Sequence, residues 1–197
     1  MTFPSPPWAL RGDLWLSLFP VRSVGTALRS PGLYGVAFVD YQEGGVLTYQ
    51  ELLVARLVRD GPVPRVSITD IWVNSTPSRD GGRSLWAIPK ELADLHVDDR
   101  RRGPVASTSW SANDAGSPIA AARFTGLHRP ALRLPFAFST TQQRDGRPVV
   151  TKVTGSARSL PCVARWDFGI DGPLAWLHGR QAVLSLRMSA FRLTFGS

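Results

Sequence analysis

Lys90 is the residue whose type and surroundings best suit covalent chemistry. It is one of only two lysines, and the apolar stretch Leu85–Pro89 precedes it. An ordinary lysine has a pKa of about 10.4 and is protonated at neutral pH. Burial against apolar side chains penalises the ammonium form, lowers that pKa and leaves an amine that can attack a ketone to form a Schiff base. The alternative is a solvent-facing lysine at a helix start, but arginine would serve there equally well and cannot form an imine.

Glu51 is the second residue with a suitable setting. It is one of three glutamates and lies between Tyr49 and the apolar residues Leu52–Val54. A carboxylate at the margin of the core can shuttle protons or orient a substrate. The alternative is an edge residue that faces water.

The sequence lacks the residues or spacings that metal sites and other common catalytic sites require. The three histidines, His96, His128 and His178, are far apart and have no metal-ligand spacing. Cys162 has apolar neighbours, which favours a small buried hydrophobe over a nucleophile. Serine-hydrolase, P-loop and dinucleotide motifs are missing. We therefore expect no metal and no organic cofactor.

The charge of the chain suggests an anionic partner only at first sight. The net charge is +8, and 21 of the 23 basic residues are arginines because Lys90 and Lys152 are the only lysines. The arginines are scattered, and the one run, Arg100–Arg102, follows two aspartates, which favours a solvated loop. No nucleic-acid-binding motif accompanies them, so we expect no nucleic-acid partner. An arginine-rich interaction protein that binds polyanions in a salt-dependent manner is the remaining alternative for this charge.

The hydropathy pattern predicts a protein outside membranes. No apolar run approaches the roughly 18 residues of a membrane helix. The first residues lack the basic and apolar regions of a secretory signal. We expect a cytoplasmic protein without membrane contact.

The elements around these residues are mostly strands. Partial alternation of apolar residues predicts strands over Leu33–Tyr41, Val66–Asn74 and Ala182–Phe195. Lys90–Leu95, after Pro89, predicts a short helix, and Asp98–Ser117 predicts a long connection or a ragged hairpin. Turn signals separate the runs at Glu43-Gly44-Gly45, Asp60-Gly61-Pro62, Asp80-Gly81-Gly82, Asp145-Gly146 and Asp171-Gly172-Pro173. We predict one domain over residues 1–197, a mainly antiparallel β barrel with a few short helices.

Three segments resemble the acetoacetate decarboxylase family: Tyr49-Gln50-Glu51, Val66–Asn74 and Gly81–Lys90. The family has a Y-x-E element followed by a G-R-x-x-x-x-P-K element, at an interval similar to the 39 residues between Glu51 and Lys90. The resemblance is detailed over residues 33–95 and loose elsewhere.

The resemblance implies a β-rich cone or barrel around an apolar cavity and a homo-oligomer. It implies that Lys90 is the Schiff-base nucleophile for a small keto acid, with Glu51 placing or moving protons. Arg83, Trp86 and Tyr49 are the residues we predict to bind substrate, although Arg83 can equally well have a structural role.

The chain departs from the family at two positions, and a third position has only a distant counterpart. Glu91 stands where the decarboxylases have a second lysine after the catalytic one, and in acetoacetate decarboxylase a neighbouring cation activates the lysine. A carboxylate there raises the pKa of Lys90 instead, so desolvation has to lower it. The second acidic residue of the family falls near Val36, and Arg11 is the nearest counterpart of an N-terminal arginine.

Three functions are compatible with these residues. The first is decarboxylation of a 3-keto acid through an imine at Lys90. The second is an aldolase or dehydratase, because an iminium stabilises a neighbouring carbanion whichever bond breaks. The third is a non-catalytic barrel that binds a small molecule. The two imine-forming enzymes separate from the non-catalytic barrel on whether Lys90 titrates far below an ordinary lysine.

Overall fold

Strands make up most of the chain in the computed structural model, which describes residues 3–22, 29–59 and 63–196. The strands in these ranges are β1 (Trp8–Val21), β2 (Gly32–Tyr41), β3 (Tyr49–Arg59), β4 (Pro64–Val73), β5 (Lys90–Leu92), β6 (Asp94–Arg102), β7 (Val105–Asp114), β8 (Ser117–Leu127), β9 (Arg133–Arg144), β10 (Arg147–Pro161), β11 (Val163–Phe168) and β12 (Leu184–Phe195). They are accompanied by helix α1 (Thr76–Trp86) and a 3₁₀ turn (Ala175–Leu177).

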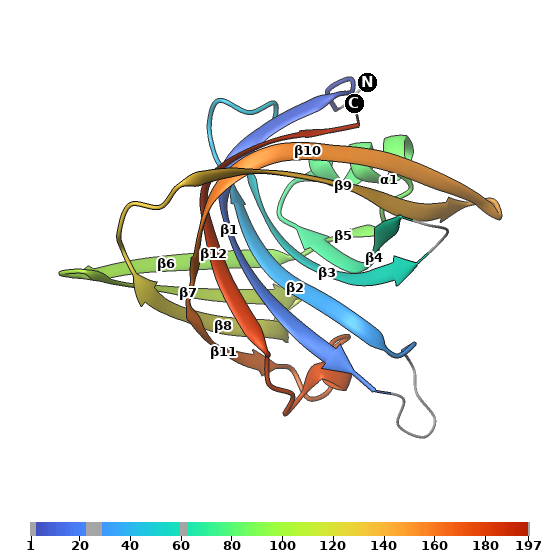
Figure 1. Ribbon diagram of the computed structural model, residues 1–197. Coiled ribbons are helices and arrows are strands. Elements are labelled where there is room, and N and C mark those ends of the chain that lie inside the picture. Colours follow the sequence, from blue (N-terminus) through green and yellow to red (C-terminus); the bar gives the residue numbers. More distant parts are fainter. Residues whose placement is uncertain (1–2, 23–28, 60–62, 197) are drawn as a thin grey trace.

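Seven strands close into a barrel in the order β3-β2-β1-β12-β10-β9-β4, with β4 pairing back to β3 (Figure 1). The pairs are antiparallel except β4–β9, which meet in parallel at Val66 and Thr140. Strand β5 adds to β4 in parallel, and helix α1 makes the crossover that a parallel pair requires. The predicted mainly antiparallel β barrel is confirmed, and the parallel pair β4–β9 makes its sheet mixed.

A second sheet, β11-β8-β7-β6, lies beside the barrel (Figure 1). Its hairpin β6–β7 turns between Arg102 and Val105, and β8 follows after a second tight turn. The segment Asp98–Ser117, predicted as a long connection or a ragged hairpin, is therefore a regular hairpin.

Side-chain alternation divides the core into two clusters. One cluster draws buried residues from all parts of the ring and from α1, so it fills the barrel interior; it includes Trp8, Leu10, Val39, Tyr41, Tyr49, Ile71, Val73, Trp86, Ala157 and Phe191. The other joins the outward faces of β1–β4 to the second sheet; it includes Trp15, Phe19, Val36, Phe38, Leu52, Val54, Trp110, Ala122 and Phe124. Neighbouring residues on one strand therefore serve different cores.

The helix lies earlier in the chain than predicted. Lys90–Leu95 is strand rather than helix, because Ile71 to Val73 of β4 supply parallel partners for Lys90 to Leu92. Tertiary pairing overrides the local helix signal here. Helix α1 instead starts after Ser75, whose hydroxyl accepts from the backbone N–H of Ser78 at 3.3 Å.

Gly81 and Gly82 lie inside α1 and do not form the predicted turn. A Cβ on Gly81 would lie 2.5 Å from the Trp8 ring, and one on Gly82 would lie 2.8 Å from Lys90 Cδ. The two glycines therefore let the helix approach the barrel closely. The helix ends at Ala87, which has a φ of 56°.

The remaining turn predictions are mixed in outcome. Turns occur at Glu43–Gly45, Asp145–Gly146 and Asp171–Pro173, while Asp60-Gly61-Pro62 lies outside the described residues. Within the described ranges, no helix has the length and apolarity to cross a membrane.

Candidate active site

Lys90 reaches the barrel interior because of its place on β5. It is the first residue of that strand and is 4% exposed, whereas the next residue, Glu91, is exposed. Successive side chains of a strand point to opposite faces, so burial of one directs the other to solvent. The stem of Lys90 passes over Gly82, where the missing side chain leaves it room.

The Lys90 ammonium donates to three buried oxygen atoms. Nζ lies 2.7 Å from Glu51 Oε2, 2.9 Å from Ser78 Oγ and 3.3 Å from the Tyr49 hydroxyl. The Tyr41 hydroxyl donates to the other carboxylate oxygen, Glu51 Oε1, at 3.2 Å. Lys90, Glu51, Tyr49, Ser78 and Tyr41 form what we call the lysine cluster.

Each member of the lysine cluster comes from an element that the topology brings to the barrel interior. Tyr41 and Tyr49 face each other in the β2–β3 ladder, and their rings stack at 4.3 Å between centroids. Glu51 lies two residues after Tyr49, so both side chains share a face of β3. Ser78 is one helical turn before Gly82, so both face Lys90.

The electrostatics of the lysine cluster differ from the expectation. Burial lowers the pKa of Lys90, but the charge of Glu51, helped by Tyr49, outweighs it and raises the pKa above the ordinary value. Burial also raises the pKa of Tyr49 and raises that of Tyr41 strongly, with Glu51 adding to both. Desolvation therefore does not give a free amine in this state: Lys90 is an ammonium paired with Glu51, and both tyrosines keep their protons.

Glu91 is not the carboxylate that raises the pKa of Lys90. Its side chain is exposed and forms an ion pair with Arg83. Arg83 also donates from Nε to the backbone carbonyl of Lys90 at 2.6 Å. Arg83 thus fixes the backbone of β5 from outside the lysine cluster, and its part in substrate binding stays a prediction.

Trp86 lies in the barrel interior as part of the packing. Its ring makes edge-to-face contacts with Trp8 at 4.8 Å and Phe195 at 4.6 Å. Of the three residues predicted to bind substrate, Tyr49 alone hydrogen-bonds to Lys90 Nζ within the described residues. Substrate contacts of Trp86 and Tyr49 stay predictions.

The two family counterparts named from the sequence add no charge to the lysine cluster. Val36 is fully buried in the cluster that faces the second sheet, on the opposite side of the barrel wall. Arg11 is exposed and donates to the backbone carbonyl of Glu43. Glu51 is accordingly the carboxylate that contacts Lys90.

Sequence reasoning missed Ser78 and Tyr41. The spacing Ser78-x-x-x-Gly82 was a usable signal for Ser78, because a small residue one turn away on the same helix face marks a close contact. Tyr41 and Tyr49 flank a short turn region, as the two ends of a hairpin do, which was a signal for their pairing.

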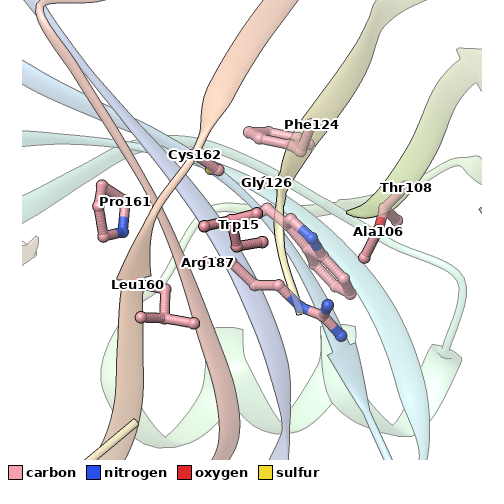
Figure 2. A pocket seen from close by; sticks show the side chains of 10 residues that line it. Trp15, Ala106, Thr108, Phe124, Gly126, Leu160, Pro161, Cys162 and Arg187 are labelled. Atoms are coloured by element: carbon pink, nitrogen blue, oxygen red, sulfur yellow. The ribbon is translucent and has the colours of Figure 1, made fainter. Parts of the chain in front are cut away.

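A small cavity lies elsewhere, between the barrel and the second sheet (Figure 2). Its volume is about 10 Å³, enough for one water-sized occupant, and Trp15, Cys162 and Arg187 are among its lining residues. Burial raises the pKa of Cys162 to about 11 against the opposing effect of Arg187, so the thiol is protonated. This cavity is too small for a substrate, and in the described ranges no three His, Cys, Asp or Glu residues form a metal site.

Comparison with known proteins identifies the same architecture. The sequence model of the acetoacetate decarboxylase family matches residues 25–188. No curated protein matches the chain. Acetoacetate decarboxylase from Legionella pneumophila subsp. pneumophila str. Philadelphia 1 is 15% identical with a TM-score of 0.67, over 98% of this chain and 86% of that one.

Two other solved structures are similar. The enduracididine biosynthesis enzyme MppR complexed with pyruvate is 16% identical with a TM-score of 0.71, over 99% of this chain and 90% of that one. An acetoacetate decarboxylase-like enzyme from Sphingomonas wittichii RW1 is 12% identical with a TM-score of 0.66, over 100% of this chain and 93% of that one. At these identities the structures establish a shared fold, and the family model covers well over half of the sequence. The chain therefore belongs to the acetoacetate decarboxylase family.

Proposed function

We propose that the chain is a lyase that forms a Schiff base between Lys90 and the ketone of a small keto acid. The observation that carries the proposal is the buried Nζ, 2.7 Å from Glu51 Oε2 and 2.9 Å from Ser78 Oγ. Such a cluster holds a nucleophile and a proton acceptor in direct contact.

Imine formation needs an uncharged amine, and the raised pKa of Lys90 makes the ammonium the resting form. Substrate that excludes water favours transfer of one proton from Nζ to Glu51 Oε2, because a neutral pair costs less to bury than two charges. Nζ then attacks the ketone carbon. The nitrogen passes a proton to the alkoxide, Glu51 returns its proton to the resulting hydroxyl, and water leaves an iminium.

For a 3-keto acid the next step is decarboxylation. The electron pair of the bond to the carboxylate moves into the iminium, carbon dioxide departs and an enamine forms. The enamine carbon takes up one proton, delivered through Glu51, and water hydrolyses the new iminium to release the ketone and Lys90. Tyr41, which donates to Glu51 Oε1, holds the carboxylate in place during these transfers.

An aldol condensation or dehydration is the second candidate. Two observations favour it. Glu91 stands where the decarboxylases of the family have a second lysine, and MppR, a protein of the same fold, has been solved with pyruvate and with the condensation product of pyruvate and imidazole 4-carboxaldehyde. The enamine of a 2-keto acid would attack an aldehyde in place of a proton.

The test is borohydride trapping followed by intact-mass measurement, with acetoacetate, longer 3-keto acids and pyruvate as substrates. Lys90→Ala is the variant, and Lys152→Ala, which removes the exposed lysine of β10, is the matched control. An adduct in the native chain and in Lys152→Ala, but absent from Lys90→Ala, is the expected result. The absence of an adduct with every ketone, in protein shown to be folded, would leave a non-catalytic binding barrel.

Carbon dioxide in the headspace then separates the two reactions. Release from a 3-keto acid supports decarboxylation. Trapped pyruvate that consumes an added aldehyde without carbon dioxide supports the aldolase.

A further inference from the structure

A groove of about 590 Å³ runs over the outer surface of the barrel, away from the lysine cluster. It crosses three neighbouring strands, β1, β12 and β10, and reaches Gly44 in the β2–β3 connection. Its lining residues are Ala9, Leu10, Arg11, Gly44, Thr154, Gly155, Ser156, Arg192, Leu193 and Thr194. Most are small, so the floor of the groove lacks the bulky side chains that would fill it.

Strand register places the polar residues of the groove in two rows. Ala9, Thr194 and Thr154 face one another across the three strands, and Arg11, Arg192 and Ser156 form the next row. Residues directly opposite in an antiparallel ladder share a face of the sheet. Leu10 and Phe191, the neighbours of the two arginines, pack in the barrel interior, so both rows lie outside.

The second row is strongly basic. Arg11 and Arg192 are directly opposite, an arrangement that repels unless an anion lies between the two charges. Arg133 of β9 extends the row, since it donates to Ser156 Oγ at 3.2 Å. No lining residue is acidic, and the nearest aspartate on this face of β1, Asp13, is bound to Arg187 and to the backbone of Ala190.

Arg11 is held ready for a ligand. Its Nε donates to the carbonyl of Glu43, and its guanidinium lies against Gly44, where any Cβ would collide with it. Gly44 has a φ of 87°, which also favours glycine. Among the residues that the structure describes, the only hydrogen bond of this guanidinium is the one from Nε, so its outer nitrogens can bind an anion, and fixing the fork beforehand reduces the entropy lost on binding.

We propose that this groove binds a small molecule with two or more phosphate or carboxylate groups, clamped between Arg11 and Arg192. The volume falls in the range of about 300–1,000 Å³ that small-molecule sites occupy. Threonine and serine hydroxyls in the floor supply further donors to anionic oxygens. The proposal is independent of the reaction at Lys90, which lies on the other side of the barrel wall.

Isothermal titration calorimetry at low ionic strength tests the proposal, with pyrophosphate and citrate as separate probes. The double variant Arg11→Gln/Arg192→Gln removes the clamp. The matched control is Arg123→Gln/Arg165→Gln, which removes another directly opposed arginine pair, on β8 and β11, without any of the groove-lining residues.

We expect the clamp variant to bind about 100-fold more weakly, with roughly a tenfold loss for each charge-assisted contact, and the control to bind like the native chain. Added salt of about 0.15 M should weaken native binding. Pyrophosphate binding alone identifies a phosphate ligand, citrate alone a carboxylate ligand, and both the shared chemistry. No binding of either probe, or an equal loss in both variants, overturns the proposal.

Discussion

The two faces of β2 and β3 are both buried but are built from different chemistry. On the outward face Phe38 stacks on Trp110 at 5.0 Å and on Trp166 at 5.4 Å, and Leu52 is fully buried beside them. On the inward face of the same strands, Tyr41 and Glu51 belong to the lysine cluster. Adjacent residues on one strand therefore serve packing on one side and acid–base chemistry on the other.

The difference indicates which face stabilises the fold. Burying an apolar side chain contributes roughly 1.5–3 kcal/mol, whereas a buried ion pair often contributes no more than apolar residues of the same size would. On β2 and β3 we therefore expect the outward face to stabilise the fold more than Tyr41 and Glu51 of the inward face do. The inward face carries a polar network that matters for the acid–base chemistry of Lys90 more than for stability.

The largest effect is expected from breaking the outward face. Phe38→Ala removes a ring that is 0% exposed and leaves a cavity between two tryptophans, which costs about 3–5 kcal/mol in the free energy of unfolding. Urea denaturation measures it. Phe138→Ala, at a ring that is 41% exposed, is the control and should cost far less. Equal losses in the two variants would contradict the assignment of the core.

Removing the charge of Glu51 from the inward face should lower the free energy of unfolding somewhat less than Phe38→Ala does. Glu51→Gln leaves Lys90 buried without its carboxylate, and we expect a loss of about 3 kcal/mol in the free energy of unfolding at neutral pH. The double variant Lys90→Met/Glu51→Leu should recover most of this loss, because no buried charge then remains. A double variant as unstable as Glu51→Gln would show that the pair itself stabilises the fold.

Sequence patterns predicted the parts of the fold where local signals agree with tertiary packing. Alternation located β2, β4 and β12, and the resemblance to the family implied one site for Lys90, Glu51 and Tyr49, which the structure has in contact.

The pair Gly81-Gly82 predicted a turn, yet both residues lie in helix α1. Glycine is needed there because Trp8 and Lys90, which are distant in sequence, pack directly against the helix. A spacing of small residues such as Ser78-x-x-x-Gly82 indicates that a helix face packs closely, but it does not say which distant residue packs there.

The pKa of Lys90 was mispredicted for a related reason. Its apolar sequence neighbours suggested desolvation, while the group that decides the direction, Glu51, is 39 residues away and meets it only in the folded barrel. That the Glu91 side chain faces solvent likewise depends on tertiary structure, because the pairing of β5 with β4 decides which face of β5 is buried.

Helix α1 packs closely on Lys90, so a substitution in the helix should move the Lys90 side chain while the stability of the fold changes little. Gly82→Ala would place a Cβ 2.8 Å from Lys90 Cδ, so the stem must shift. We expect borohydride trapping to slow by about 10- to 100-fold, since misplacement of a reacting group by roughly 1 Å costs that much. Stability should change little, because the alanine favours the helix by about 1 kcal/mol.

Gly81→Ala is the matched control on the same helix. Its Cβ would collide with the rigid Trp8 ring at 2.5 Å rather than with Lys90. It should lower the melting temperature while the trapping rate of the folded protein stays near the native value. Slower trapping in Gly81→Ala than in Gly82→Ala would refute the positioning argument.

The slope of stability against pH should have opposite signs in native protein and in Glu51→Gln. The native Lys90 and Tyr41 have pKa values raised above the ordinary 10.5 and 10.0, so the folded state binds more protons than the unfolded state once the pH exceeds about 10. The Cys162 thiol, whose pKa is raised from 9.0 to about 11, adds a slope of the same sign from about pH 9, so native stability is constant below about pH 9 and falls above it. In Glu51→Gln burial acts on Lys90 without the opposing carboxylate and lowers its pKa, so stability should rise with pH in the range below about 9, where Cys162 does not contribute. Urea midpoints across this range measure both slopes, and parallel slopes would contradict the pairing.

The smallest effect compares two buried tyrosines on opposite faces of β2. Tyr41 donates to Glu51 Oε1 at 3.2 Å, and Tyr34, which faces the other core, donates to the backbone carbonyl of Ser30 at 2.7 Å. Replacing either by phenylalanine removes one hydrogen bond and should cost about 1 kcal/mol. Only Tyr41→Phe also removes a donor from the Glu51 carboxylate, which favours the protonated acid and therefore shifts the pH profile of trapping. A shifted profile in Tyr34→Phe as well would mean that the two faces of the barrel wall are coupled, so that packing and chemistry are not separable in this fold.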